Sequence, residues 1–138
     1  MVPAGRVIVA ADPTMSEWFE SRAWIWLHYA VVKLGRGELF EAIGMLSFFR
    51  EQVLGPMLYR RANLPQRGVR RIELHGIDPD GLLASTLATH DRDSVSMAIR
   101  MAVDAYIDLR ADALPENIAD DVALRAVLAM LKEYSERG

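Results

Sequence analysis

Four charged side chains gather at one turn of the chain: Lys33, Arg36, Glu38 and Glu41. They lie on the last turn of one expected helix and the first turns of the next. The two cations suit phosphate oxygens, and a glutamate suits an acceptor group that needs a base. The same placement complements the helix dipoles, because cations are stabilised at a helix C-terminus and carboxylates at an N-terminus. The residues alone leave both interpretations open.

Further arginines follow this turn. Arg50 lies on the second helix, where it could pin a loop or bind an anion, and we expect it to form a structural ion pair. Five more arginines stand within twelve residues, with no acid before Glu73: Arg60, Arg61, Arg67, Arg70 and Arg71. Their forked donors suit nucleotide phosphates or RNA. Few aromatic residues are interleaved with them, so binding of single-stranded nucleic acid is not indicated.

Acidic residues dominate the last third of the chain. They are Asp104, Asp108, Asp112, Glu116, Asp120 and Asp121. We expect the arginine patch to pair with these acids inside one domain. Two alternatives stay open: Arg67, Arg70 and Arg71 form an anion-binding patch, or the acidic face binds a polycationic substrate such as an aminoglycoside, or a basic partner domain.

Thiol and metal chemistry find little support in the residues. The chain contains no cysteine, and its three histidines, His28, His75 and His90, have no ligand spacing. The Asp78-Pro-Asp80 and Asp91-Arg-Asp93 pairs are expected to cap helices or form turns. We therefore predict no metal site and no complete catalytic site in this chain.

Length and composition predict a single domain. The 138 residues are 51% hydrophobic, which is enough for one core and too little for two ordinary domains. A net charge of −3 does not indicate a nucleic-acid-binding protein. No window approaches the roughly 18 apolar residues of a membrane span. We therefore expect a cytoplasmic protein.

The spacing of apolar residues predicts the elements. Helices are expected over 14–34, from Leu39 to the Gly55-Pro56 pair that should end or kink the helix, from Asp91 or Asp93 to Pro115, and from Asn117 or Asp120 to Tyr134. Between them, 63–81 should be mostly loop with an extended stretch over 69–74, and a short helix capped by Asp78 or Asp80 should follow over 82–89.

These elements predict an all-α fold, an antiparallel bundle of four main helices plus one short helix. The bundle should occupy 13–138, after a short extended segment over 1–12. The first helix is apolar on every side between Ala23 and Val32, except at His28. We therefore expect it to be a central helix surrounded by protein, with His28 as a hydrogen-bonded core residue.

Three short motifs carry a resemblance to a known family: Lys33-x-x-Arg-Gly-Glu-Leu-Phe-Glu-Ala42, Leu46-Ser-Phe-Phe-Arg50 and Val53-Leu-Gly-Pro56. Together they resemble the C-terminal helical domain of bacterial nucleotidyltransferases of the DNA polymerase beta superfamily, the aminoglycoside-adenylyltransferase-like kind. The similarity covers about 12–110. It implies that a separate α/β domain holds magnesium and a nucleoside triphosphate, and that the helical bundle closes the cleft and helps to bind the nucleotide or the acceptor. It also implies that Val7 to Ala11 is the last strand of such a domain.

The chain departs from that family in lacking its catalytic motif. No adjacent Gly-Ser pair is followed by an Asp-x-Asp pair on a strand, so no carboxylates are placed to hold magnesium. The prediction is therefore a substrate-binding or accessory helical domain that works with a catalytic domain in cis or in trans. The alternative is a self-associating helical interaction module, a homodimer joined through Val7 to Ala11 and the tryptophans.

Overall fold

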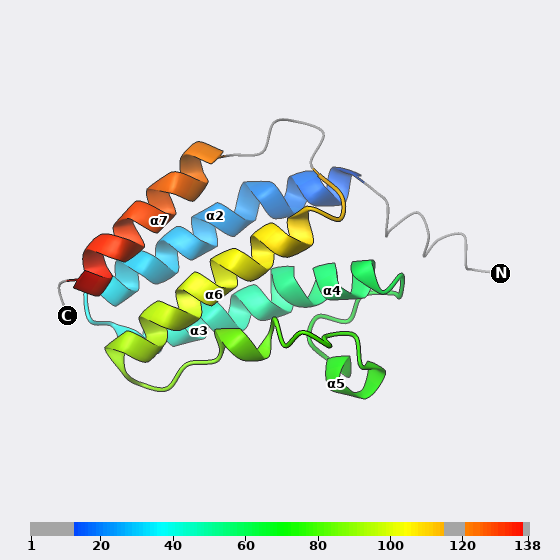
Figure 1. Ribbon diagram of the computed structural model, residues 1–138, viewed down its shortest axis with the longest axis horizontal. Helices are drawn as coiled ribbons and strands as arrows, with labels where there is room; N and C mark the ends of the chain where they lie inside the picture. Colours follow the sequence, from blue (N-terminus) through cyan, green and yellow to red (C-terminus); the bar gives the residue numbers. More distant parts are fainter. Residues whose placement is uncertain (1–12, 115–120, 137–138) are drawn as a thin grey trace.

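A long helical hairpin forms one side of the molecule. The structure, a computed structural model, describes residues 13–114 and 121–136. Helix α2 spans Pro13–Gly35 and α3 spans Leu39–Phe49. The turn between them needs Gly37, which has a φ of +76°, a backbone conformation that glycine adopts without steric cost. The hairpin is antiparallel, as predicted (Figure 1).

Helix α3 continues into α4 through a widened turn. Residues Arg50–Leu54 form a π-helix, and α4 follows over Gly55–Arg61. The expected end of the helix at Gly55-Pro56 is therefore wrong, because the helical column runs through this pair. The ring of a proline clashes with the carbonyl four residues earlier. In the π turn the Gly55 N–H bonds to the Arg50 carbonyl five residues back, which widens the turn directly before Pro56.

A long connection carries the chain back along the bundle. It contains the short helix α5, Ile72–His75, and a 3₁₀ turn over Ala84–Thr86. The extended stretch expected over 69–74 is wrong, since α5 occupies its second half and residues 70 and 71 form a turn. The helix expected over 82–89 is reduced to the 3₁₀ turn, and Asp78 caps it by accepting hydrogen bonds from the N–H groups of Leu82 and Leu83, at 2.8 and 3.0 Å.

Two further helices complete the bundle, α6 over Arg92–Arg110 and α7 over Asp121–Glu136. Asp91 caps α6 by accepting a hydrogen bond from the Ser94 N–H at 3.0 Å, as the sequence predicted. Helix α6 is antiparallel to α2 and to α7, and it is parallel to the α3–α4 column because the long connection returns the chain to the same end (Figure 1). The all-α fold class is confirmed.

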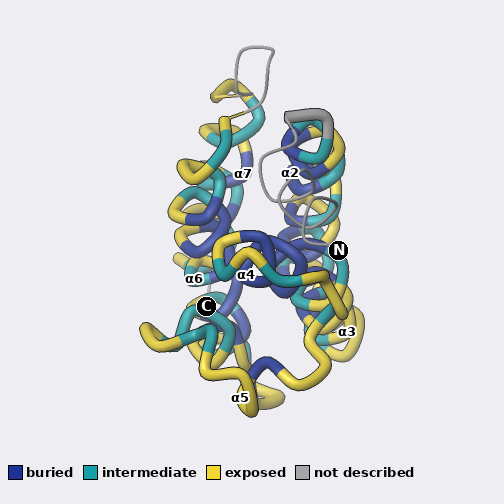
Figure 2. Tube along the Cα trace, turned by 90° about the vertical axis from the view of Figure 1, so that its right-hand side faces the viewer, coloured by how far each residue is buried: buried dark blue, intermediate teal, exposed yellow. Residues whose placement is uncertain are grey.

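Helix α2 packs against α3, α6 and α7, as expected for a central helix. One strip of it nevertheless faces solvent. His28 is exposed and Ile25 is 65% exposed, so the prediction of a buried His28 is wrong. Three neighbours do not enclose a helix completely, and Figure 2 shows α2 at the side of the bundle. Composition alone therefore did not predict this face.

A buried carboxylate joins α2 to α6. Glu20 accepts hydrogen bonds from the Tyr106 hydroxyl at 2.7 Å and from Trp24 Nε1 at 2.9 Å. Arg110 Nη1 lies 3.2 Å from the same carboxylate. Burial, together with the hydrogen bond to Glu20, raises the pKa of Tyr106 above its ordinary value. The pair is well satisfied, as a buried ion pair must be to persist.

Three sequence expectations lie outside the described residues. They concern the extended segment over 1–12 with its Val7–Ala11 run, and the acids Glu116 and Asp120. Within 13–114 and 121–136 no strand forms, apart from an isolated bridge between Arg67 and Val69. In the same ranges no helix is long and apolar enough to cross a bilayer.

Candidate functional site

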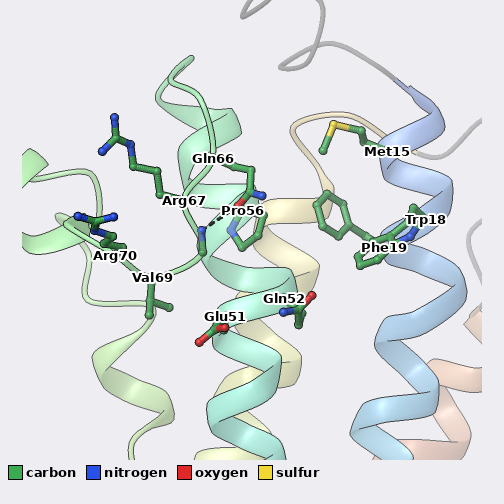
Figure 3. Close-up of a pocket in the computed structure, with 11 residues that line it drawn as sticks. Met15, Trp18, Phe19, Glu51, Gln52, Pro56, Gln66, Arg67, Val69 and Arg70 are labelled. Carbon is green, nitrogen blue, oxygen red and sulfur yellow. Dashed lines mark hydrogen bonds between the residues drawn. The ribbon is translucent and has the colours of Figure 1, made fainter.

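A large hollow of the described structure lies at the N-terminal end of α2. It is a cavity of about 940 Å³ between the first turns of α2 and the loop 66–70, with the π turn below it (Figure 3). Cavities of about 300–1,000 Å³ are the size that buries most of a small organic ligand. The volume therefore suits a ligand larger than a single ion.

One wall of the cavity is aromatic and apolar. Met15, Trp18 and Phe19 project from α2 toward the space (Figure 3). Phe19 is buried and Trp18 is 38% exposed, with the Arg22 guanidinium carbon 4.3 Å from the centroid of the Trp18 ring. Such a wall suits a flat ring, because aromatic stacking and apolar burial favour the same placement.

The floor of the cavity is the π turn. It presents the side chains of Glu51 and Gln52, followed by Pro56. Glu51 makes no hydrogen bond or ion pair with any described residue, so its carboxylate is available as an acceptor. Pro56 has no N–H, so the backbone carbonyl that would pair with it in a regular helix lacks that donor. The floor is therefore rich in acceptors. Helical turns of this π type occur frequently at functional sites.

The opposite wall is the loop 66–70, which two contacts hold against the helices. A Cβ on Gly55 would lie 2.2 Å from the Gly68 carbonyl oxygen, so only glycine permits this approach. The Tyr59 hydroxyl donates to the Arg70 carbonyl. The next residue, Arg71, has a φ of +66°, which is uncommon for a residue other than glycine. The loop is thus held in a defined shape.

Two of the predicted anion-binding arginines belong to this loop wall. Arg67 and Arg70 line the cavity with their backbone and stems, and their guanidinium groups extend away from α2 (Figure 3). Neither group has a hydrogen bond or ion pair with another described residue, and the same holds for Arg71. All three side chains are exposed. Arg67 and Arg70 are free to meet an anion at the outer rim of the cavity, whereas Arg71 does not line it.

The junction residues lie at the other end of α2. Trp18 and Lys33 are fifteen residues apart on this helix, or about 22 Å at 1.5 Å per residue. Lys33 Nζ is 3.6 Å from Glu38 and 3.8 Å from Glu41, and Arg36 is 3.5 Å from Glu38. The structure therefore brings the four predicted residues together, and it pairs them with one another.

A tyrosine completes the junction cluster. The Tyr29 hydroxyl donates to Glu41 at 2.7 Å, and this hydrogen bond raises the pKa of Tyr29 above its ordinary value. Each carboxylate of the cluster already has a partner. That arrangement agrees with the helix-dipole interpretation, and it leaves less capacity for an added ligand.

Among the described residues, Arg50 has no acidic partner. Its Nη1 donates to the carbonyl and hydroxyl oxygens of Thr86, at 2.9 and 3.1 Å. The structural ion pair expected for Arg50 is therefore wrong, and the residue pins the 3₁₀ turn to the column instead. Burial lowers the pKa of its guanidinium from the ordinary value.

The expected pairing of arginines with acids occurs mainly at one residue. Arg61 lies 3.0 Å from Asp108 and 2.7 Å from Asp112, and its hydrogen bond to Asp112 raises its pKa. Asp104 pairs with Arg100, and Asp121 lies 3.8 Å from Arg110. Each described acid of the predicted set thus has a cation beside it. This neutralisation argues against a polycationic substrate on that face.

A metal centre finds no support in the part of the chain that the structure describes. No three histidine or acidic side chains converge there.

Comparisons with protein-family models, curated proteins and solved structures find nothing that matches this chain.

Sequence reasoning missed the cavity residues Met15, Phe19, Glu51 and Gln52. One signal was present, because a proline five residues after Glu51 disturbs the regular helical bonding there. The pattern of apolar residues runs through this stretch without a break, and so it gave no warning of a widened turn.

Proposed function

We propose that this chain is a helical ligand-binding domain that holds a nucleotide in the cavity between α2 and the loop 66–70. It would do so for a catalytic domain supplied in cis or in trans. The observation that carries the proposal is the pairing of an aromatic wall with charged groups that have no partner among the described residues. A base has a flat face for Trp18, its amino groups can donate to Glu51, and a phosphate can meet Arg67 or Arg70 at the rim.

The position of the family-like motifs agrees with this proposal. Two of the three, over 46–50 and 53–56, overlap the two ends of the π turn that forms the cavity floor. The first motif lies at the junction, where the charges are already paired. A nucleotide is also favoured over an aminoglycoside, because unpaired cations at the rim repel a polycation.

Calorimetric titration of the full chain with ATP tests the proposal. We expect weak, saturable binding without added metal. Trp18→Ala should weaken it by about 1–3 kcal/mol, the usual contribution of one stacked base. Phe40→Ala is the matched control, since Phe40 is 79% exposed, lies outside the cavity and should be neutral. Absence of binding at millimolar ATP, or equal losses in both variants, would contradict the proposal.

A further inference from the structure

Arg60 is a buried cation with too few partners. It lies in the last turn of α4 and is only 4% exposed. Nη1 donates to Ser16 Oγ at 2.9 Å. Nε and Nη2 are also buried, and neither has a hydrogen-bond partner in the described structure. Buried guanidinium groups in proteins are normally paired and hydrogen-bonded, so two open donors on one group need an explanation.

The neighbouring arginine shows what a satisfied partner set looks like here. Arg61 makes hydrogen bonds with Asp108 and with both oxygens of Asp112. Asp112 is the acid whose charge acts on Arg60, but its oxygens are occupied by Arg61. No other described carboxylate forms an ion pair with Arg60. The open donors therefore make no hydrogen bond with an anion of the described chain.

Arg60 is also adjacent to the cavity. Its guanidinium carbon lies 5.5 Å from the centroid of the Phe19 ring, and Phe19 lines the cavity. Pro56, one helical turn before Arg60, lines it as well. Ser16, which follows the lining residue Met15, fixes the guanidinium and in turn donates to the Ala113 carbonyl. Arg60 itself does not line the cavity, and Phe19 is the residue that contacts both.

We propose that Arg60, positioned by Ser16, is the inner anion site of this cavity and takes a phosphate group through Nε and Nη2. Two donors on one edge of a guanidinium match two oxygens of a phosphate in a bidentate contact. Phe19 contacts both the cavity and the guanidinium, so its ring must move for a phosphate in the cavity to reach the open donors. Assigning this phosphate to a nucleotide rests on the proposed function, whereas binding of inorganic phosphate does not.

Thermal unfolding with and without inorganic phosphate tests the site by itself, with sodium chloride at equal ionic strength as the salt control. Wild type should gain melting temperature with phosphate, because a ligand that binds only the folded state stabilises it. Arg60→Met should lose this gain, and without phosphate it should melt no lower than wild type, since it removes a buried charge that has few partners.

Arg61→Met is the matched control, with the opposite expectation. It should melt lower than wild type, because Asp108 and Asp112 lose their partner, and it should keep the gain from phosphate. Arg60→Lys should fold, keep the charge and show a smaller gain, since an ammonium lacks the fork. The proposal is overturned if Arg60→Met keeps the phosphate gain, or if wild type shows none beyond the salt control.

Titration with a nucleoside and its monophosphate separates the inner site from the proposed function. We expect Arg60→Met to weaken binding of the monophosphate by about 10- to 100-fold, because hydrogen bonds to a charged group are lost. Binding of the nucleoside should be unchanged. Equal binding of the monophosphate by wild type and Arg60→Met would overturn the role of Arg60 and leave nucleotide binding intact. If inorganic phosphate raises the melting temperature through Arg60, but neither nucleoside nor monophosphate binds, the nucleotide function is refuted and the anion site stands.

Discussion

The two ends of α2 place their charged side chains in different surroundings. At the junction end, Lys33, Arg36 and the two glutamates neutralise one another within 4 Å. At the cavity end, Glu51 and Arg67 have no charged partner among the described residues. A cluster of charges in a sequence therefore often marks groups that satisfy each other. Residues available to a ligand are those that folding leaves unpaired.

The largest expected effect comes from a carboxylate near the cavity end. Glu20→Ala should lower the free energy of unfolding by about 3–5 kcal/mol, because it leaves Arg110 buried without its main partner. Glu38→Ala at the junction should cost at most about 1 kcal/mol, since exposed ion pairs contribute little. Urea unfolding of both variants measures the difference. Similar losses of unfolding free energy in the two variants would show that the ion pairs at the two ends contribute equally to stability.

Glycine substitutions should separate the two parts of the α3–α4 column. Gly55→Ala should lower the free energy of unfolding by about 1–3 kcal/mol, because its Cβ would meet the Gly68 backbone and push the loop wall outward. Gly44→Ala has no atom within 4 Å of its Cβ and should stabilise the helix by about 0.5–1 kcal/mol. Urea unfolding gives both values. A stable Gly55→Ala protein that still binds ligand would mean that the close approach is not needed.

Alkaline titration compares the two tyrosine–glutamate pairs. The pKa of Tyr106 is raised in the folded state, so below pH 10 both states keep the phenol proton and the contribution is complete. Above pH 10 the unfolded tyrosine ionises first, and stability falls as pH rises. Tyr106→Phe should flatten this decline more than Tyr29→Phe, because Tyr106 is buried and Tyr29 is 37% exposed. Denaturant midpoints from pH 8 to pH 11 measure the slopes, and equal slopes would contradict the difference in burial.

The smallest expected effect concerns the rim. Arg70→Ala should weaken nucleotide binding by up to about 1 kcal/mol, and this loss should shrink at high salt because the group is exposed. Lys33→Ala should leave binding unchanged. Calorimetry at low and high salt provides the measurement. If Lys33→Ala weakens nucleotide binding and Arg70→Ala does not, the ligand binds at the junction, as the charged motif first suggested.

Much of the fold was predictable from the sequence. Apolar residues at three- and four-residue steps correctly predicted the long helices. Asp91 predicted the start of α6, and Gly37 predicted the turn after α2. Local signals sufficed there because capping and glycine turns depend on neighbouring residues. The exposure of His28 was not predictable in this way, since it depends on how many helices surround α2.

The cavity was less accessible to prediction, because it depends on contacts between distant residues. Glu51 and Arg67 are sixteen positions apart, and they meet the same cavity only because Gly68 packs on Gly55. The fate of Arg60 and Arg61 illustrates the same limit. Two identical neighbours on one helix point to different sides, so one pairs with acids and the other is buried almost alone.

The π turn also sets the rotational phase of everything that follows it. Each residue of an α-helix turns the chain by about 100°, so winding all five residues 50–54 as regular α-helix, without the π turn, would swing α4 by about that angle. Tyr59 would then leave the loop that it fastens, and Arg60 would exchange its interior position for another side of the column. The π turn thus absorbs one extra residue and keeps the second half of the column aligned with the first turns of α2.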